Sequence, residues 1–376
     1  MRILYLTEEP ITFSGTMVRG GQIHVSKVVE SLRDRGHDVH LIDWNSKPER
    51  DWDYQHSIAP RSRFLIDPVR TLRRAISVGD AIGADVIVSK TRKTYLPGVF
   101  AARRLNIPHI VHVGSSPRET GSGLSGHIER QSVVTRLKAP HDGYFVVCST
   151  IADELVQLGI RRNQIFDVRN AVDTDRFNPD SIPEELDERC QEQFDTSDDR
   201  LLLGFVGSLQ PYKGLDDLAA ALDDVKADCH LVIAGDGPER TQLERVFGDR
   251  ATFLGAVPYE QIPAFYNQID ALVLPSHTEG LPRVVLEAQA TATPLITTRV
   301  GGLPEVLEDG ETGLLVDPRS SRQLVTAIDK LGTDAALRTR LGENGRRAVV
   351  ESYSWETMYE RYEQFLETIV GSECDG

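Results

Sequence analysis

The chain has 376 residues, of which 40% are hydrophobic, and a formal net charge of −15 at pH 7. This length is sufficient for two domains with large cores, and the acidic charge excludes wholesale nucleic-acid binding, which requires a basic face. The scattered cysteines indicate neither a disulfide framework nor a zinc site. Without an apolar run of eighteen residues or a signal peptide, we expect a cytoplasmic protein.

Apolar, strand-like runs alternate with helical segments twice along the chain, which predicts two doubly wound α/β domains. We expect the strands of the first domain at 2–7, 38–43, 85–90, 109–114 and 143–149. We expect those of the second domain at 201–208, 229–235, 251–257, 270–276, 293–298 and 312–317. The polar, acidic segment 178–200 between the two sets is the predicted linker.

Candidate site residues of the first domain follow its strands, because such sheets bind ligands at the carboxyl ends of their strands. Gly20-Gly21 stand before a helix expected at 22–35, where backbone amides could contact a diphosphate, and a simple turn is the alternative. His112 lies at the end of the fourth strand, before a loop expected at 115–126. A purely structural histidine is the alternative there.

Two basic segments of the first domain stand out in an acidic protein. Lys90, Arg92 and Lys93 follow the third strand, which predicts contact with an anionic acceptor. The segment 61–76 places five arginines among apolar residues, a pattern compatible with lying on an anionic membrane surface. The alternative is a helix that packs its apolar side on the core and exposes its basic side to solvent.

In the second domain, the strand 201–208 ends at Ser208 and leads into the Lys213-Gly214 pair. Lys213 could offset the charge of a diphosphate there, and a solvated surface lysine is the alternative.

Glu279 and Glu287 stand eight positions apart across a strand-to-helix turn. Pro282 suits the first helical position, so Glu279 falls in the loop and Glu287 about two turns into the helix. Gly280 and the free amides at the helix start could hold a phosphate between the two carboxylates. The alternative is a capping Glu279 and a solvated Glu287.

Together these motifs resemble the retaining GT-B glycosyltransferases of glycosyltransferase family four, in the family's order and over essentially the full chain. The supporting segments are 20–21, 35–39, 170–177, 213–214, 234–240, 279–287 and 301–313. The resemblance implies an α/β fold of two Rossmann-like domains facing across a cleft. The acceptor domain would span 1–180, completed by a C-terminal helix at 356–376, and the nucleotide-sugar donor domain would span 181–355.

The resemblance also implies roles in catalysis. Glu279 would stabilise the developing positive charge of the donor sugar, and Glu287 would bind the ribose. Lys213 would neutralise the leaving diphosphate, and His112 would lie near the anomeric centre.

Further residues would bind the phosphates. The resemblance implies this for Gly20-Gly21 and for the backbone amides of Gly280, Leu281 and Arg283. Many relatives carry an arginine at the position of Ser208 in the donor site, so we expect Arg283, or else Arg118, to supply the missing cation. Arg118 is also a candidate acceptor contact.

The implied reaction moves a sugar from a nucleoside-diphosphate sugar to an acceptor, without a divalent metal or other cofactor, because lysine and helix dipoles stabilise the leaving group. We expect retention through same-face attack, with a carboxylate nucleophile as the alternative. A GT-B epimerase and a non-catalytic nucleotide-sugar-binding protein are the rival functions. A role in surface-glycan, lipid-linked oligosaccharide or glycoconjugate synthesis would bring the protein to the inner face of the membrane.

Overall fold

The computed structural model describes residues 1–11, 20–46, 53–60, 66–117, 123–180 and 200–371. The chain forms two compact units: unit 1 comprises Met1–Arg169 and Met358–Gly376, and unit 2 comprises Asn170–Thr357. The first boundary therefore precedes the expected one at 180/181, because Asn170 and Val172 bond to the second unit. Asn170 Nδ2 donates to the carbonyl of Leu281, and the amide of Val172 donates to the carbonyl of Tyr353.

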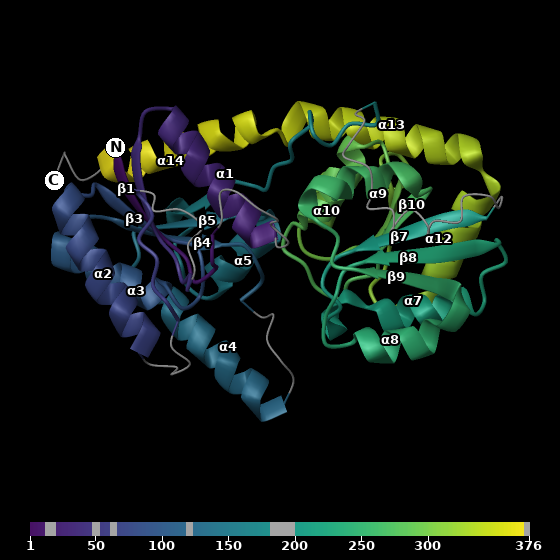
Figure 1. Cartoon of the computed structure of the whole chain (residues 1–376), viewed down its shortest axis with the longest axis horizontal. Coiled ribbons are helices and arrows are strands. Elements are labelled where there is room, and N and C mark those ends of the chain that lie inside the picture. Colours follow the sequence, from purple (N-terminus) through teal and green to yellow (C-terminus); the bar gives the residue numbers. More distant parts are fainter. Residues whose placement is uncertain (12–19, 47–52, 61–65, 118–122, 181–199, 372–376) are drawn as a thin grey trace. The chain divides into compact units, whose positions relative to one another are not determined.

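Unit 1 contains a six-stranded parallel sheet in the order β2-β1-β3-β4-β5-β6 (Figure 1). Its strands are β1 (Arg2–Leu6), β2 (Asp38–Ile42), β3 (Val86–Ser89), β4 (His109–Val113), β5 (Gly143–Val146) and β6 (Ile165–Asp167). The first five were expected from their apolar runs. The sixth was not, since three residues are too few to show a period.

Helices cover both faces of this sheet (Figure 1). They are α1 (Gly20–Asp34), α2 (Ile66–Ile82), α3 (Tyr95–Leu105), α4 (Gly123–Leu137), α5 (Ser149–Gln157), η1 (Arg162–Gln164) and the last helix, α14 (Trp355–Gly371). From Met358 onward α14 packs on unit 1. Tyr359 donates to the carbonyl of Lys27 over 3.0 Å, and the rings of Tyr362 and Phe145 lie 4.5 Å apart.

Unit 2 repeats the arrangement with a parallel sheet in the order β12-β11-β10-β7-β8-β9. Its strands are β7 (Leu201–Val206), β8 (Cys229–Ala234), β9 (Ala251–Gly255), β10 (Ala271–Leu274), β11 (Leu295–Thr298) and β12 (Leu314–Val316). Its helices are η2 (Pro211–Lys213), α7 (Leu215–Leu222), α8 (Arg240–Phe247), η3 (Gly248–Arg250), η4 (Tyr259–Gln261), α9 (Ile262–Gln268), α10 (Arg283–Ala290), α11 (Leu303–Val306), α12 (Ser321–Thr333) and α13 (Ala335–Ser352). The expected pair of doubly wound domains is confirmed.

Several expectations about loops need correction or fall outside the described residues. Helix α1 begins at Gly20, so Gly20-Gly21 form its first turn and not a loop before it. The loop expected at 115–126 ends earlier, because α4 begins at Gly123. Arg118, the segment 61–65 and most of the linker at 178–200 lie outside the described residues. None of the helices in the described ranges combines the length and apolar character needed to cross a bilayer.

Candidate functional site

The loop after β10 carries Glu279 and is held by glycine contacts on both sides. Gly214 has a φ of +66°, and a Cβ there would lie 2.2 Å from the carbonyl oxygen of Pro275. Gly301 has a φ of +54°, and a Cβ there would lie 2.0 Å from the carbonyl oxygen of Glu279. Only glycine allows both the left-handed conformation and the close approach. The position of the Glu279 loop is therefore fixed by its neighbours.

Lys213 and Glu279, predicted independently from two motifs, form an ion pair. Lys213 Nζ lies 2.6 Å from Glu279 Oε1, and Ser276 Oγ donates to the same oxygen over 2.7 Å. Both charged side chains are about nine-tenths buried, with 11% and 10% of their surface exposed. The solvated-lysine alternative is therefore wrong. The pair presents a cation and an oriented carboxylate side by side at the carboxyl edge of the sheet.

Glu287 lies in α10 and is only 4% exposed, so the alternative of a solvated helix residue is also wrong. Its Oε2 accepts a hydrogen bond of 3.3 Å from the hydroxyl of Tyr266, and its Oε1 lies 3.8 Å from Nε of Arg283. Burial raises the pKa of Glu287, and Arg283 and Tyr266 oppose that shift. The carboxylate is thus paired but accepts few hydrogen bonds, which leaves acceptor capacity for a ligand hydroxyl.

Arg283, the expected phosphate cation, is also buried, with 8% of its surface exposed. Its Nη2 donates to the hydroxyl of Tyr259 over 3.2 Å, and its guanidinium carbon lies 5.0 Å from the centre of the Trp355 ring. Its Nε and Nη1 have no hydrogen-bond partner among the described residues. The structure therefore brings Arg283 to Glu287, and its contact with phosphate stays a prediction.

The other donor-site candidates of unit 2 lie along the same edge. Ser208 is exposed in the loop that follows β7. The carbonyl of Gly280 accepts from the amide of Gly302 over 2.6 Å, and the carbonyl of Leu281 accepts from Asn170. These bonds use carbonyls, so they do not occupy the amides that are predicted to bind phosphate.

In unit 1, His112 and His24 meet at the carboxyl edge of the sheet. Their rings lie edge to face, with centroids 4.7 Å apart and an angle of 79° between the planes. His112 is fully buried, and neither of its ring nitrogens has a hydrogen-bond partner among the described residues. Burial, and then the charge of Lys90, lowers the pKa of His112 and keeps the ring neutral. His24 was not among the site residues predicted from the sequence.

The structure also places Gly20-Gly21 and the basic cluster of unit 1. A Cβ on Gly21 would lie 2.3 Å from Oε1 of Glu9, so a carboxylate already lies at the start of α1. Lys93 pairs with Glu8 at 3.3 Å, whereas Arg92 lies 3.9 Å from Glu129. Lys93 and Arg92 are thus held by different acidic partners.

Lys90, by contrast, lies next to the end of β4, the strand that carries His112. Its Nζ lies 3.7 Å from where a Cβ of Gly114 would be, next to His112. Of the three basic residues, Lys90 is therefore the best placed to act together with His112.

Asp216, Asp217 and His277 place their ligand atoms within 4.8 Å of one another, the one group of this kind among the described residues. His277 Nε2 lies 2.6 Å from Asp217 Oδ2, however, and Asp216 is exposed. The pair joins the Glu279 loop to α7, and this hydrogen bond accounts for its geometry without a metal.

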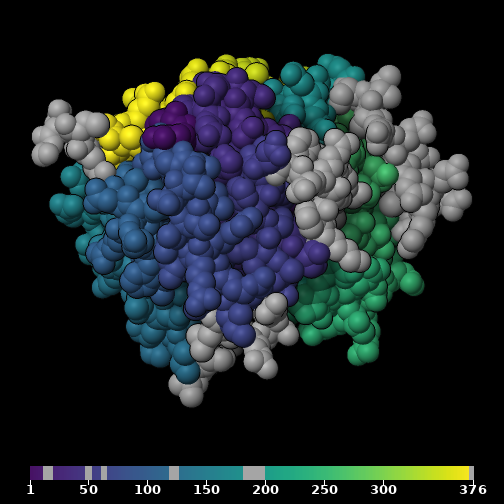
Figure 2. Space-filling model, turned by 60° about the vertical axis from the view of Figure 1, so that its left-hand side comes forward, coloured from purple at the N-terminus to yellow at the C-terminus, as the bar shows by residue number. Residues whose placement is uncertain are grey.

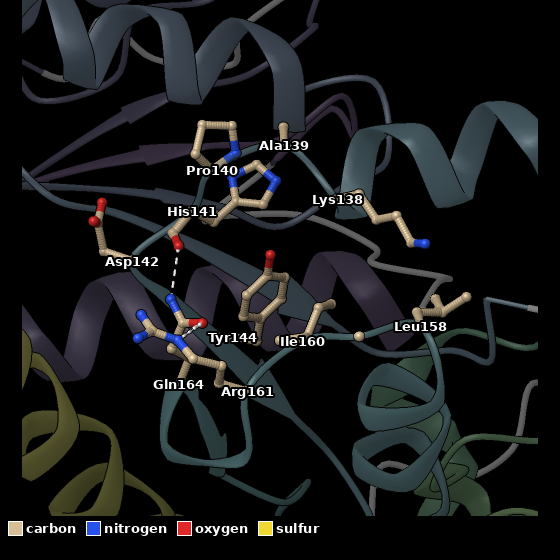
Figure 3. Close-up of a pocket in the computed structure, with 11 residues that line it drawn as sticks. Lys138, Ala139, Pro140, His141, Asp142, Tyr144, Leu158, Ile160, Arg161 and Gln164 are labelled. Carbon is tan, nitrogen blue, oxygen red and sulfur yellow. Dashed lines mark hydrogen bonds between the residues drawn. The ribbon is translucent and has the colours of Figure 1, made fainter.

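A cavity of about 570 Å³ lies at the opposite, amino-terminal edge of the first sheet (Figure 3). Gln164 bridges its wall, because its amide donates to the carbonyl of His141 over 3.2 Å and accepts from Arg161 (Figure 3). His141 Nε2 is bonded to the carbonyl of Arg136, and Tyr144 donates to the carbonyl of Leu137. The side chains of Gln164, His141 and Tyr144 are thus held by hydrogen bonds within the protein, an arrangement typical of a structural niche.

Comparison with known families accounts for both units. Residues 187–348 match the model for glycosyl transferases group 1, and residues 18–176 match the model for Glycosyltransferase Family 4. A GDP-mannose-dependent alpha-mannosyltransferase of Corynebacterium glutamicum is 30% identical over 80% of this chain and 74% of its own length. The chain belongs to glycosyltransferase family 4. Its motifs at 213–214 and 279–287 thus lie within a matched glycosyltransferase domain.

Another relative matches a shorter stretch of this chain. An alpha-D-kanosaminyltransferase of Streptomyces kanamyceticus is 36% identical over 42% of this chain and 43% of its own length. Among solved structures, sucrose-phosphate synthase from Thermosynechococcus elongatus matches 99% of this chain and 100% of its own, with a TM-score of 0.83 and 21% identity. Anabaena HepE in complex with UDP matches 98% and 100%, with a TM-score of 0.78 and 18% identity. These structures confirm the GT-B fold of this glycosyltransferase.

Proposed function

We propose that this glycosyltransferase moves a sugar from a nucleoside-diphosphate sugar to an acceptor and that unit 2 binds the donor. The observation that carries the proposal is the buried Lys213–Glu279 pair at the carboxyl edge of the second sheet. A cation beside an oriented carboxylate suits a substrate whose leaving group is anionic and whose sugar becomes positive. The relatives named above, one GDP-mannose-dependent and one bound to UDP, support a nucleotide donor.

The donor-site roles follow from charge and position. When a diphosphate enters, Lys213 would transfer part of its interaction from Glu279 to the phosphate oxygens. Glu279 would then face the sugar with a less compensated negative charge, which stabilises the developing oxocarbenium. Glu287 would accept hydrogen bonds from the ribose hydroxyls, for which its burial and few existing hydrogen bonds are suitable. No divalent metal is needed if Lys213 and the helix-start amides neutralise the leaving group.

The stereochemical course we propose is retention by same-face attack. A carboxylate nucleophile must be free to reach the anomeric carbon. In this protein one oxygen of Glu279 already accepts bonds from Lys213 and Ser276, and Glu287 is buried against Tyr266. Both contacts favour electrostatic and binding roles over covalent attack. The departing phosphate would then act as the base for the acceptor hydroxyl.

We further propose that unit 1 binds an anionic acceptor, in surface-glycan, lipid-linked oligosaccharide or glycoconjugate synthesis at the inner face of the membrane. The neutral, buried His112 beside Lys90 provides a polar ring next to a cation at the carboxyl edge of the first sheet. This combination suits a phosphate-bearing acceptor near the reacting sugar. It also leaves His112 available to contact the sugar itself.

The test of the proposal is nucleotide release from a panel of UDP-, GDP- and ADP-sugars, with and without acceptors, in the presence of EDTA. We expect one class of sugar nucleotide to raise the melting temperature and to release nucleoside diphosphate fastest when acceptor is added. An epimerase would produce free nucleotide and a new sugar without acceptor. A binding protein would be stabilised without turnover, and loss of all turnover in EDTA would contradict the metal-free mechanism.

A further inference from the structure

Helices α2, α3 and α4 form one layer on unit 1, on the side of the sheet opposite α1 and α14 (Figure 1). The alternation of β1 explains the two sides. Leu4 and Leu6 pack in one cluster with Ala75 of α2, whereas Tyr5 between them lies next to Tyr362 of α14. The outer surface of the α2–α3–α4 layer is broad and exposed (Figure 2).

The two faces of unit 1 carry opposite charge. The α2–α3–α4 layer has seven arginines (Arg70, Arg73, Arg74, Arg103, Arg104, Arg130, Arg136) and three acidic residues (Asp67, Asp80, Glu129). On the opposite face, α1 and residues 358–371 of α14 have three basic residues (Lys27, Arg33, Arg361) and five acidic residues (Glu30, Asp34, Glu360, Glu363, Glu367). A basic face is therefore kept within a chain of net charge −15.

Most of these arginines are available to an outside partner. Arg73, Arg103, Arg104 and Arg130 are exposed, and none of them forms an ion pair with another described residue. A guanidinium that has no internal carboxylate can bind phosphate with two hydrogen bonds at once.

Large apolar side chains are exposed on the same layer. Val69 of α2, Phe100 of α3 and Ile128 of α4 are 49%, 53% and 61% exposed. By contrast, Leu72 and Ile76 of α2 pack against the core cluster. Part of the apolar side of the segment 61–76 therefore packs on the core, as expected for a helix that exposes its basic side to solvent. Any membrane contact must use the outer surface of the three helices instead.

We propose that the outer surface of α2, α3 and α4 docks unit 1 on an anionic lipid bilayer. The arginines would bind lipid phosphates, and Phe100 and Ile128 would enter the boundary between headgroups and acyl chains. A soluble polyanion would satisfy the arginines but would leave the exposed apolar side chains in water, so the combination favours lipid. Docking would also hold α4, whose Glu129 lies near Arg92 of the predicted acceptor cluster, at the bilayer. The proposal does not depend on the transfer reaction.

The test is sedimentation of the full chain with vesicles of phosphatidylglycerol and phosphatidylcholine, and with vesicles of phosphatidylcholine alone, at low and moderate salt. We expect binding to the anionic vesicles only, weakened by salt. The triple variant Arg73→Gln, Arg103→Gln, Arg104→Gln should bind about a hundred-fold more weakly, the ratio that corresponds to about 1 kcal/mol for each arginine at an anionic surface.

The matched control is the triple variant Arg245→Gln, Arg322→Gln, Arg347→Gln, which removes the same charge from exposed positions of unit 2. It should bind like the wild type. Phe100→Ser should weaken binding that persists at moderate salt, and Val350→Ser, exposed on α13, should not. Any one of three results would overturn the proposal. These are the absence of binding to anionic vesicles, an equal loss of binding in both triple variants, and tighter binding to single-stranded RNA than to vesicles.

Discussion

Lys213 Nζ lies 2.6 Å from Oε1 of Glu279, although Lys213 ends the short helix η2, Glu279 lies in the loop after β10, and 66 positions separate them. Each charge is the other's partner before any substrate is present, so neither is buried alone. A ligand with an anionic group could compete for Lys213 and leave Glu279 oriented by Ser276. This exchange makes the charge at the reacting sugar dependent on the presence of the diphosphate.

Lys213→Gln should weaken binding of the nucleoside diphosphate much more than binding of the nucleoside. The variant removes a charged hydrogen bond, worth about 1.5–3 kcal/mol, and leaves the Glu287 region unchanged. Calorimetric titration of the wild type and the variant with both ligands gives the comparison. An equal loss for the two ligands would mean that Lys213 supports the fold of the loop and does not contact phosphate.

Gly214→Ala should lower kcat/KM and stability together, because the new Cβ would meet the carbonyl of Pro275 in the Glu279 loop. Gly310→Ala is the matched control, since Gly310 also has a positive φ, +79°, but no atom within 4 Å of a new Cβ. The control should cost only the strain of the left-handed conformation, about 1–2 kcal/mol, and should keep its activity. Urea denaturation and initial rates separate the two, and identical behaviour of the variants would contradict the clamped loop.

Arg283→Ala tests two roles at once. If Arg283 supplies the phosphate cation that Ser208 does not, affinity for the nucleoside diphosphate should fall by about 1–3 kcal/mol. Because Arg283 is buried against Glu287, stability should also fall, by about 3–5 kcal/mol, as when one partner of a buried pair is removed. Unchanged affinity in calorimetry, with reduced stability, would limit Arg283 to positioning Glu287.

Stability should fall on acidification because of His141. Burial lowers the pKa of His141 to about 4, partly offset by its hydrogen bond to the carbonyl of Arg136, whereas the unfolded value is 6.5. Between these pH values the unfolded chain binds more protons, so the free energy of unfolding decreases as pH falls from about 6.5 to 4, by up to about 3 kcal/mol. Urea denaturation at several pH values measures the slope.

The control for this pH effect is His127, an exposed histidine of α4. His127→Gln should keep the acid-side slope, whereas His141→Gln should reduce it. A wild-type slope in His141→Gln would assign the effect to other groups, of which His109 and His56 also have lowered pKa values because of burial.

The positions of most strands along the chain could be predicted, as could the sheet edge on which the candidate residues lie, because apolar runs and turn residues are local signals. The start of α1 could not, because a glycine pair is normally typical of a turn. In the structure the carboxylate of Glu9 lies against Gly21 at the start of that helix. Such a contact between distant segments has no local signature.

The burial of Glu287 is a similar case with one missed signal. Arg283 stands four residues before Glu287 in the same helix, a spacing that by itself indicates a pair. The hydrogen bond from Tyr266 of α9 to Glu287 and the edge-to-face contact of His24 with His112 join residues that are far apart in the sequence. Only the packing of the elements could bring these together.

The central claim, that Glu279 acts on the sugar of a nucleotide donor, is tested most directly by Glu279→Gln. The substitution keeps size and removes charge, so transfer to acceptor should fall by about 10²–10³-fold while the free nucleoside diphosphate still binds. The melting temperature should fall but the protein should stay folded, because Lys213 loses its buried carboxylate partner and keeps the amide oxygen as an acceptor. Glu351→Gln, at an exposed position of α13, is the control and should transfer normally. Release of nucleotide by Glu279→Gln at the wild-type rate, in the presence of donor and acceptor, would contradict the account.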